Sequence, residues 1–193
     1  MPAHIDLSIL VLSLLERRST FLPRLLDSLD RQVRGRPVEV LVLMDNGRRE
    51  IGEKRNQLKA MARGAYICYI DDDDRIAEHY VDAILSALTT GPDVVVFDAW
   101  VTLDGKAGKI CKYGYEFNPA NRREAYYRKP NHLMVHKRQN VRAIPFKEIS
   151  LGEDDEWAAR VAPHIKSQVR IDDTLYYYEY NRSTSRSSKE RKR

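Results

Sequence analysis

The stretch YICYIDDDDRI, residues 66–76, places four consecutive aspartates directly after an apolar run. The apolar run predicts a buried strand, because apolar residues without polar alternation are typical of strands covered on both faces. Four adjacent carboxylates repel one another, so this strand end calls for a positive charge nearby. Clustered carboxylate oxygens suit a hard cation such as Mg²⁺ or Mn²⁺, which takes its other ligands from phosphates and water. The competing interpretation is a solvated acidic loop in which Asp74 caps the following helix.

Alternating strand and helix patterns surround the aspartates in the first hundred residues. Continuous apolar stretches predict strands, and apolar residues at helical spacing predict helices. The predicted strands cover 4–14, 38–44, 65–70 and 92–100, and the predicted helices cover 21–33, 52–64 (closed by Gly64) and 78–88. This alternation predicts an α/β fold with a mostly parallel central sheet flanked by helices. Ligands bind beyond the carboxyl ends of the strands in such sheets, which is where Ser13, Asp45 and the aspartates fall.

The pattern is weaker after Trp100. The predicted elements are a hairpin or long loop over 104–117, a short strand over 131–137, a helix over 152–165 and a strand over 174–180. A single domain is predicted to span 1–181. The basic polar tail over 182–193 is expected to be flexible, because it has little apolar surface to bury.

The composition excludes several classes of protein. Hydrophobic residues make up 42% of the chain and charged residues 32%, as in ordinary globular domains. The longest apolar stretch, residues 9–15, is far shorter than the roughly 20 residues of a membrane span. No basic region precedes it as in a signal peptide, so a cytoplasmic location is expected. Cys68 and Cys111 are too few for a disulfide framework and lack metal-ligand spacing, so both are expected to be small apolar fillers.

The net charge of +5 is unevenly distributed along the chain. Residues 106–147 carry 11 basic and two acidic residues, a net charge of +9. Residues 1–105 carry a net charge of −4 and residues 148–181 a net charge of −5. A basic middle between acidic flanks indicates a site where cations and anions meet.

Five short motifs follow one another on these predicted elements. They are SILVLSLLERR with Ser13, LVLMDNG with Asp45, IGEKRN with Lys54, Arg55 and Asn56, the D-x-D of Asp71 and Asp73, and LGEDDEW with Glu153 and Asp154. A tyrosine-rich strand and a polar loop, LYYYEYNRSTS, come last. Over most of its length the chain therefore resembles the family 2 glycosyltransferases of the GT-A fold. The resemblance implies a metal-dependent enzyme that inverts the anomeric centre of the sugar in a single displacement.

The resemblance also implies a donor site for a nucleotide-diphosphate sugar, most often a UDP-sugar. The implied donor-binding residues are Ser13, Asp45, Lys54, Arg55, Asp71, Asp72 and Arg182, and the implied ligands of Mn²⁺ or Mg²⁺ are Asp73 and Asp71. Asp154 would be the general base that takes the proton of the acceptor hydroxyl. Asp155 competes for that role, because the motif carries three acids in a row.

Two departures from the family pattern stand out. Many relatives have a proline near Ser13, where this chain has Leu12 and Leu14. The fourth aspartate also permits a second D-x-D register, formed by Asp72 and Asp74.

The acceptor site is expected in the basic segment 106–147, between the metal motif and the base. Basic residues interleaved with tyrosines bind phosphates and stack on bases or sugars, which favours a polyanionic acceptor. Such an acceptor could be a hydroxylated base in phage-type DNA, an acidic envelope glycan or a phospholipid-linked glycan. The candidate contacts are Trp157, Lys137 and Arg138. The alternative is that these charges are solvated or serve only the donor diphosphate.

Two histidines, His132 and His136, lie two residues apart in the predicted short strand and would share one of its faces. One of them could reach the metal, or both could be ordinary packed residues.

Other functions use similar residues. A sugar-phosphate nucleotidyltransferase also combines aspartates with a metal, but it usually has a glycine-rich loop near its amino terminus, and SLLERRSTF contains no glycine. A metal-dependent nuclease would suit the basic segment but would not explain the pattern of Asp45 and Arg55. A non-catalytic nucleotide-sugar binding module would be expected to lose Asp73 or Asp154, and both are present.

Overall fold

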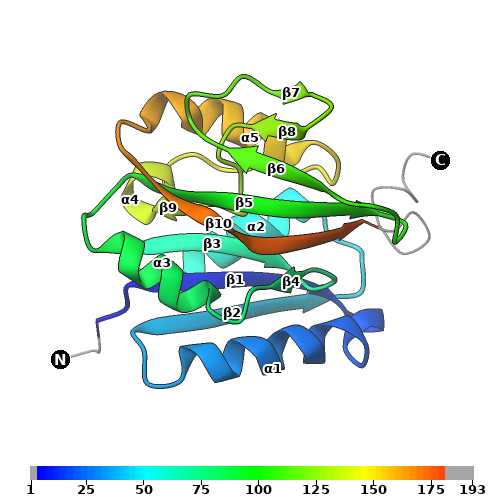
Figure 1. Cartoon of the computed structure of the whole chain (residues 1–193). Helices are drawn as coiled ribbons and strands as arrows, with labels where there is room; N and C mark the ends of the chain where they lie inside the picture. The colour runs from blue at the N-terminus through cyan, green and yellow to red at the C-terminus, as the bar shows by residue number, and fades with distance from the viewer. Residues whose placement is uncertain (1–3, 181–193) are drawn as a thin grey trace.

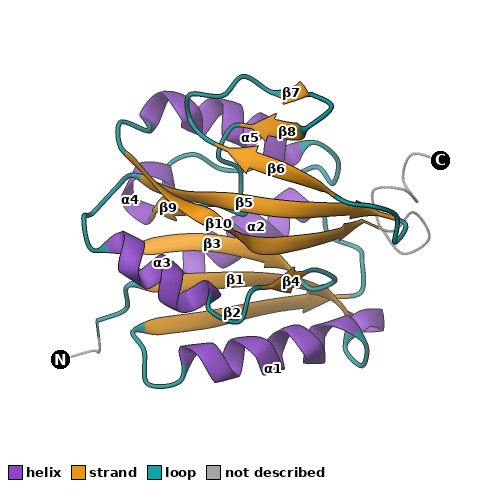
Figure 2. Ribbon diagram, in the orientation of Figure 1, coloured by secondary structure: helices purple, strands orange, loops and turns teal. Residues whose placement is uncertain are grey.

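The computed structural model describes residues 4–180. In this part of the chain ten strands form one mixed sheet in the order β2-β1-β3-β9-β5-β6-β8-β7, with β10 pairing with both β5 and β4. Helices cover both faces of the sheet: α1 and α3 lie on one face, and α2 and α5 on the other (Figures 1 and 2).

The first half of the chain supplies the long strands β1, β2, β3 and β5, which all run in the same direction. Its elements are β1 (Leu7–Leu14), α1 (Phe21–Val33), β2 (Val38–Asp45), α2 (Ile51–Met61), β3 (Tyr66–Asp71), α3 (Tyr80–Leu88) and β5 (Val94–Leu103). β1 lies between β2 and β3 and runs parallel to both. All three strands therefore end at the same edge of the sheet, which is the right-hand edge in Figure 1. This edge carries the polar residues that the sequence predicts beyond the strand ends.

The helical spacing in α1 is used as expected. Leu22, Leu25 and Leu29 recur every three to four residues and are buried against the sheet. The second helix differs from its prediction, because α2 ends at Met61 rather than at Gly64. Gly64 instead lies against β1, where an added Cβ would come within 2.6 Å of the Ser8 nitrogen. Close backbone packing, and not helix termination, therefore requires this glycine.

The remaining elements extend the sheet. In the first half of the chain these are a short 3-10 helix at Leu15–Arg17 and β4 (Arg75–Ile76), which pairs with β10. In the second half they are β6 (Lys109–Tyr113), β7 (Ala120–Asn121), β8 (Ala125–Arg128), β9 (Val135–Lys137), α4 (Arg138–Val141), α5 (Glu153–Val161), a 3-10 helix at Ala162–His164 and β10 (Gln168–Tyr180). Of the two predicted alternatives for 104–117, the hairpin is confirmed, because β6 pairs antiparallel with β5. The turn between them contains Asp104 and Gly105, both with positive φ.

The last strand is longer than the tyrosine-rich segment that predicts it. β10 begins at Gln168 and runs parallel to β5, with register shifts between Arg170 and Tyr176. The polar residues Asp172 and Asp173 interrupt the apolar pattern there, which explains why the pattern misses the first half of the strand.

The two cysteines both lie in the core. Cys68 and Cys111 are buried, unpaired thiols, as expected for apolar fillers. Across residues 4–180, no helix combines the length and apolar character that a bilayer crossing requires.

Candidate functional site

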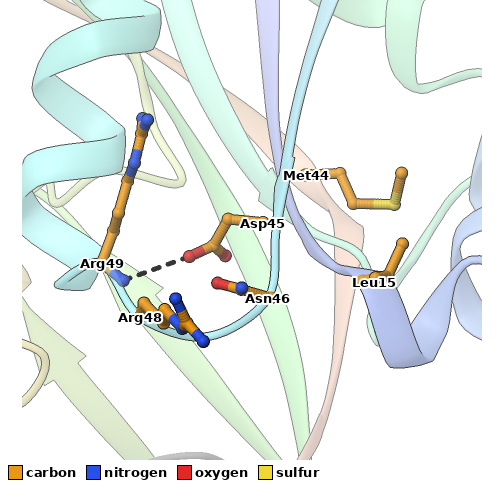
Figure 3. Close-up of a pocket in the computed structure, with 6 residues that line it drawn as sticks. All are labelled: Leu15, Met44, Asp45, Asn46, Arg48 and Arg49. Atoms are coloured by element: carbon orange, nitrogen blue, oxygen red, sulfur yellow. Dashed lines mark hydrogen bonds between the residues drawn. The ribbon is translucent and has the colours of Figure 1, made fainter.

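Two adjoining cavities open at the carboxyl ends of β1, β2 and β3. The larger has a volume of about 400 Å³ and is lined by Leu15, Met44, Asp45, Asn46, Arg48 and Arg49 (Figure 3). The smaller has a volume of about 60 Å³ and is lined by Leu12, Ser13, Leu14, Arg17, Ile51, Lys54, Asp71 and Asp72. The larger cavity offers two apolar side chains together with an acid, an amide and two guanidinium groups. This mixture suits a ligand with a flat ring and several hydrogen-bonding groups.

Asp45 is held ionised between these cavities. Lys54 Nζ donates to its Oδ1 at 2.9 Å and to the Ser13 carbonyl at 3.3 Å. The Arg49 amide donates to Oδ2 at 3.2 Å, the bond drawn in Figure 3. Burial opposes ionisation, but these donors outweigh it and hold the pKa of Asp45 below its ordinary value. The predicted residues Ser13, Asp45 and Lys54 are thus brought together.

The aspartate run alternates between buried and open side chains. Asp72 and Asp74 are 1% and 2% exposed, whereas the side chains of Asp71 and Asp73 are 29% and 22% exposed. The run forms a turn after β3, closed by a hydrogen bond from the Asp74 amide to the Asp71 carbonyl at 3.2 Å, and this turn directs Asp72 and Asp74 inward while Asp71 and Asp73 stay open. The geometry therefore favours the Asp71 and Asp73 register over the Asp72 and Asp74 register.

Asp72 is fully engaged inside the protein. Ser13 Oγ donates to its Oδ2 at 2.6 Å, and Arg17 Nη1 donates to its Oδ1 at 2.7 Å. The same Arg17 nitrogen lies 3.0 Å from Asp73 Oδ2. Asp72 and the Ser13 hydroxyl therefore hold Arg17 beside Asp73, and their side chains offer little surface to a ligand. The sequence analysis does not identify Arg17 as a site residue. Its position could have indicated one, because Arg17 follows β1 and the neighbouring strand β3 ends in the aspartates.

Asp74 corrects the expectation of a helix cap. His79 precedes α3 and makes no side-chain capping bond. Asp74 instead accepts hydrogen bonds from the Tyr176 hydroxyl at 2.6 Å and from the Glu179 amide at 2.9 Å. Because it is buried, its pKa lies well above the ordinary value. Asp74 thus attaches the aspartate run to β10.

Arg55 connects the aspartate run to the E-D motif of α5. Its Nη2 lies 3.4 Å from Asp71 Oδ1, and its Nε lies 3.3 Å from Glu153 Oε1. Its guanidinium is buried, and within residues 4–180 its Nη1 has no hydrogen-bond partner. Burial opposes the charge of Arg55, but the two carboxylates outweigh it and raise its pKa. Conversely, burial raises the pKa of Asp71, yet Arg55 and His132 bring it far below its usual range.

The two histidines have different surroundings. His132 Nε2 lies 3.7 Å from Asp71 Oδ2, and its Nδ1 lies 3.7 Å from Asp154 Oδ2. His136 instead donates from Nε2 to the Asn131 carbonyl at 2.9 Å and packs edge-on against Trp157. Burial lowers the pKa of His136 to about 4, so it is a neutral core residue. Only His132 belongs to the site.

The E-D motif places its acids in different environments at the start of α5. Glu153 is buried against Arg55, and its pKa is raised chiefly by that burial. The Asp154 side chain is 30% exposed and faces His132. Asp155 is exposed. Asp154 is therefore the acid of this motif that the fold directs toward the aspartates.

The structure corrects the candidate acceptor contacts. Trp157 is fully buried, stacks on Phe146 with ring centroids 4.5 Å apart and donates to the Ile144 carbonyl, so it is a core residue. Lys137 pairs with Tyr66 at the amino end of β3. Arg138 Nε donates to the Gly64 carbonyl at 2.6 Å. Both cations therefore lie at the edge of the sheet opposite the aspartates.

Several cations of the basic segment contact tyrosine rings and carbonyls of the segment itself. Lys109 Nζ lies 4.5 Å from the centroid of the Tyr126 ring, and Arg122 Cζ lies 5.1 Å from the centroid of the Tyr127 ring. Arg128 donates to the Ala120 and Tyr127 carbonyls. Many of these charges thus stabilise the small β6-β8-β7 extension locally.

The residues present fit a cation that takes some of its ligands from the protein and the others from a bound anion. Within residues 4–180, no group of three or more His, Cys, Asp or Glu side chains is arranged to hold a metal alone. Burial raises the pKa of Asp73 to about 6; Asp71 and Asp72 add to the effect, and Arg17 opposes it. A half-buried carboxylate with excess negative charge around it suits a hard cation completed by phosphate oxygens. Arg182, the last predicted donor residue, lies outside the described residues.

Comparison with known proteins defines the fold. No protein-family model matches the sequence, and a search of curated proteins finds no match. The structure of S. aureus TarS 1-349 in complex with UDP-GlcNAc matches with a TM-score of 0.67 and 14% identity, over 91% of this chain and 59% of that one. The TarS 1-349 complex with UDP matches with a TM-score of 0.66, 14% identity, and coverage of 91% and 61%. A longer S. aureus TarS structure matches over 37% of its length.

This chain therefore spans about three fifths of TarS 1-349. The similarity confirms the predicted architecture, an α/β fold whose central sheet has a parallel core and flanking helices, and the TarS structures share this fold.

Proposed function

We propose that the chain is a metal-dependent, inverting glycosyltransferase that moves a sugar from a UDP-sugar to an acceptor hydroxyl. The observation that carries this proposal is the convergence of three separate motifs at one sheet edge. Asp45 borders the larger cavity, Asp71 and Asp73 open beside it, and Asp154 faces Asp71 across the His132 ring. The TarS structures that share the fold contain UDP-GlcNAc and UDP, which supports a nucleotide-sugar donor.

The donor would occupy the two cavities. The larger cavity supplies Leu15 and Met44 as apolar surface for a base, and Asp45 and Asn46 as polar groups for its edge or for the ribose. The smaller cavity leads from Lys54 to Asp71, where a diphosphate would lie. Arg17 stands at this position, held by Asp72 beside Asp73, and would approach the diphosphate as a fixed cation.

Asp73, with Asp71 beside it, would hold Mn²⁺ or Mg²⁺ together with the donor phosphates. When bound, the cation supplies positive charge that stabilises the departing nucleoside diphosphate. Arg17 would add to that stabilisation from the protein, because it is already oriented before the reaction. Arg55 keeps Asp71 ionised and in place.

Asp154 would take the proton of the attacking hydroxyl. Its carboxylate belongs to α5, whereas the donor-side carboxylates follow β3, so base and cation would remain separate. Glu153 fixes the start of α5 by its contact with the buried Arg55. An in-line attack by a hydroxyl on the face opposite the leaving group inverts the anomeric centre, which is the outcome expected of a single displacement.

We infer that the acceptor group is a hydroxyl on a polyanion, either a modified DNA base or an acidic glycan. The supporting observation is the net charge of +9 over residues 106–147, the segment that contains β6 and β8. An excess of cations favours an anionic acceptor.

A donor screen tests the function. Purified protein with MnCl₂ is mixed in turn with UDP-, GDP-, CMP- and dTDP-sugars, and nucleotide release is followed alongside calorimetric binding of UDP. We expect release from a UDP-sugar, loss of release in Asp73→Ala, and unchanged release in the control Asp30→Ala, whose carboxylate lies on the exposed side of α1. UDP binding without release in the wild type would indicate a binding module. Release of pyrophosphate from UTP with a sugar phosphate would indicate a nucleotidyltransferase.

A further inference from the structure

The imidazole of His132 occupies an unusual position between the two functional carboxylates. Its Nε2 faces Asp71 Oδ2 and its Nδ1 faces Asp154 Oδ2, each at 3.7 Å. The residue is only 6% exposed. Within residues 4–180 neither ring nitrogen has a hydrogen-bond partner. Burying two ring nitrogens without hydrogen-bond partners costs free energy of folding. The position of this ring therefore calls for an explanation.

The backbone around His132 is firmly attached to the core. The Tyr69 amide on β3 donates to the His132 carbonyl at 3.0 Å. The Asn131 side chain accepts from the Leu133 amide at 3.1 Å, and the Asn131 carbonyl accepts from His136. The Tyr69 ring lies edge-on to the imidazole, with centroids 6.3 Å apart. These contacts hold the His132 backbone in place, so its ring can orient the carboxylates on both sides.

The carboxylates on its two sides are anchored unequally. Asp71 is already held by Arg55 through Oδ1, which leaves Oδ2 directed at His132. Within residues 4–180, the approach to His132 is the only polar contact of the Asp154 side chain. The gap of 3.7 Å is within about 1 Å of hydrogen-bond distance. Such contacts commonly shorten when substrate fills a site.

We propose that His132 is a positioning residue that donates from both ring nitrogens: its Nδ1–H orients the Asp154 carboxylate toward the acceptor hydroxyl, and its Nε2–H ties that carboxylate to Asp71 on the donor side. The inference rests on the proposed function and deepens it. The arrangement follows the logic of catalytic triads, in which a third group holds the base in its productive orientation. It also links the acceptor side to the donor side, because one rigid ring touches a carboxylate of each.

Two amide substitutions separate the two ring nitrogens. The amide of His132→Asn lies near the position of Nδ1, whereas the longer side chain of His132→Gln reaches toward the position of Nε2. Steady-state release of UDP from UDP-GlcNAc with MnCl₂, water being the acceptor, gives kcat and KM for each variant. If another UDP-sugar proves to be the donor in the screen, it replaces UDP-GlcNAc.

We expect His132→Ala to lower kcat by about 100-fold while KM changes little, because a misplaced catalytic group costs about that factor. His132→Asn should recover a larger share of kcat than His132→Gln. His164→Ala, which removes an exposed histidine, is the matched control and should behave like the wild type. Thermal unfolding of every variant identifies any that fail to fold.

A double mutant tests whether His132 acts through Asp154. In the Asp154→Asn background, His132→Ala should cause no further loss, because groups that act as one unit are not additive. Equal losses in the Asn and Gln variants, or additive losses in the double mutant, would overturn the inference and leave a purely structural histidine. An active wild type with an equally active His132→Ala would overturn it too. A wild type that neither binds UDP nor releases it from any UDP-sugar would instead refute the proposed function, and this inference with it.

Discussion

The cations around the aspartate run and those of the basic segment 106–147 are used in different ways. Near the aspartates, Lys54, Arg55 and Arg17 are directed at carboxylates that border the two cavities. In the basic segment, Lys109 and Arg128 are directed at backbone carbonyls and tyrosine rings of the same segment. These two cations of the more basic region therefore stabilise the fold of their own segment. Charge composition locates cations along the chain, but only their partners indicate whether they serve a site or hold up a fold.

The largest expected effect concerns the base on the acceptor side. Asp154→Asn should lower kcat for nucleotide release by about 1,000-fold, within the range usual for loss of a general base. Asp155→Asn should change it less than about threefold, because its carboxylate is exposed beside the site. Initial rates of UDP release at saturating donor measure both. Equal losses from the two substitutions would show that the orientation of α5 does not select the base.

Buried pairing around the aspartates should also matter more for stability than pairing in the basic segment. Arg55→Leu leaves Asp71 and Glu153 without their shared partner, and should lower the free energy of unfolding by about 3–5 kcal/mol. Arg128→Leu breaks bonds to carbonyls that water can replace, and should cost about 1 kcal/mol. Urea unfolding followed by circular dichroism measures both. A larger loss from Arg128→Leu would reverse the comparison.

Asp73 offers a trade between stability and function. Burial and its acidic neighbours raise its pKa in the folded protein to about 6, above the unfolded value of 3.8. Ionised Asp73 therefore destabilises the metal-free fold at neutral pH, and this penalty disappears as the pH falls below about 4, where both states are protonated. Asp73→Asn should stabilise the metal-free protein by about 1–2 kcal/mol at pH 7.5 and by nothing near pH 4.

Thermal unfolding with EDTA at both pH values measures this difference, and Asp30→Asn on α1 is the control. A stabilisation that is the same at both pH values would show that Asp73 carries no excess negative charge. The affinity of the wild type for Mn²⁺ should decrease when the pH is lowered below about 6, because Asp73 then takes up a proton.

The smallest effect is expected on the surface of the basic segment. Lys137→Ala removes a charge at the edge opposite the aspartates, and should leave the rate of transfer to any acceptor unchanged within about twofold. If a polyanion such as DNA is the acceptor, the wild-type rate should fall as salt is raised from 50 to 200 mM, because counterion release drives such binding. A salt-independent rate with DNA would remove the polyanionic acceptor from consideration.

Sequence patterns predict the elements of the first half of the chain well and those of the second half less well. The boundaries of α1 agree fully with the predicted helix, because three leucines repeat at helical spacing. The start of β10 was missed, because Asp172 and Asp173 interrupt the pattern and the strand is held by its pairing with β5. Gly64 was assigned to a helix end, although its role is contact with Ser8 of β1, which lies 56 positions earlier. Local patterns report local structure, and long-range packing decides the rest.

For the site, the sequence by itself determined which residue types were available: alternate aspartates after a buried strand, Asp45 at another strand end, and an acidic start to a later helix. The tertiary structure alone decided which of them work together. It directs Asp72 to the Ser13 hydroxyl and Asp74 to the Tyr176 hydroxyl. It buries Trp157 in the core. It also brought His132 between Asp71 and Asp154. The physical reason is that side-chain alternation and hydrophobic spacing act over a few residues, whereas burial and charge pairing join residues that only the folded chain places in contact.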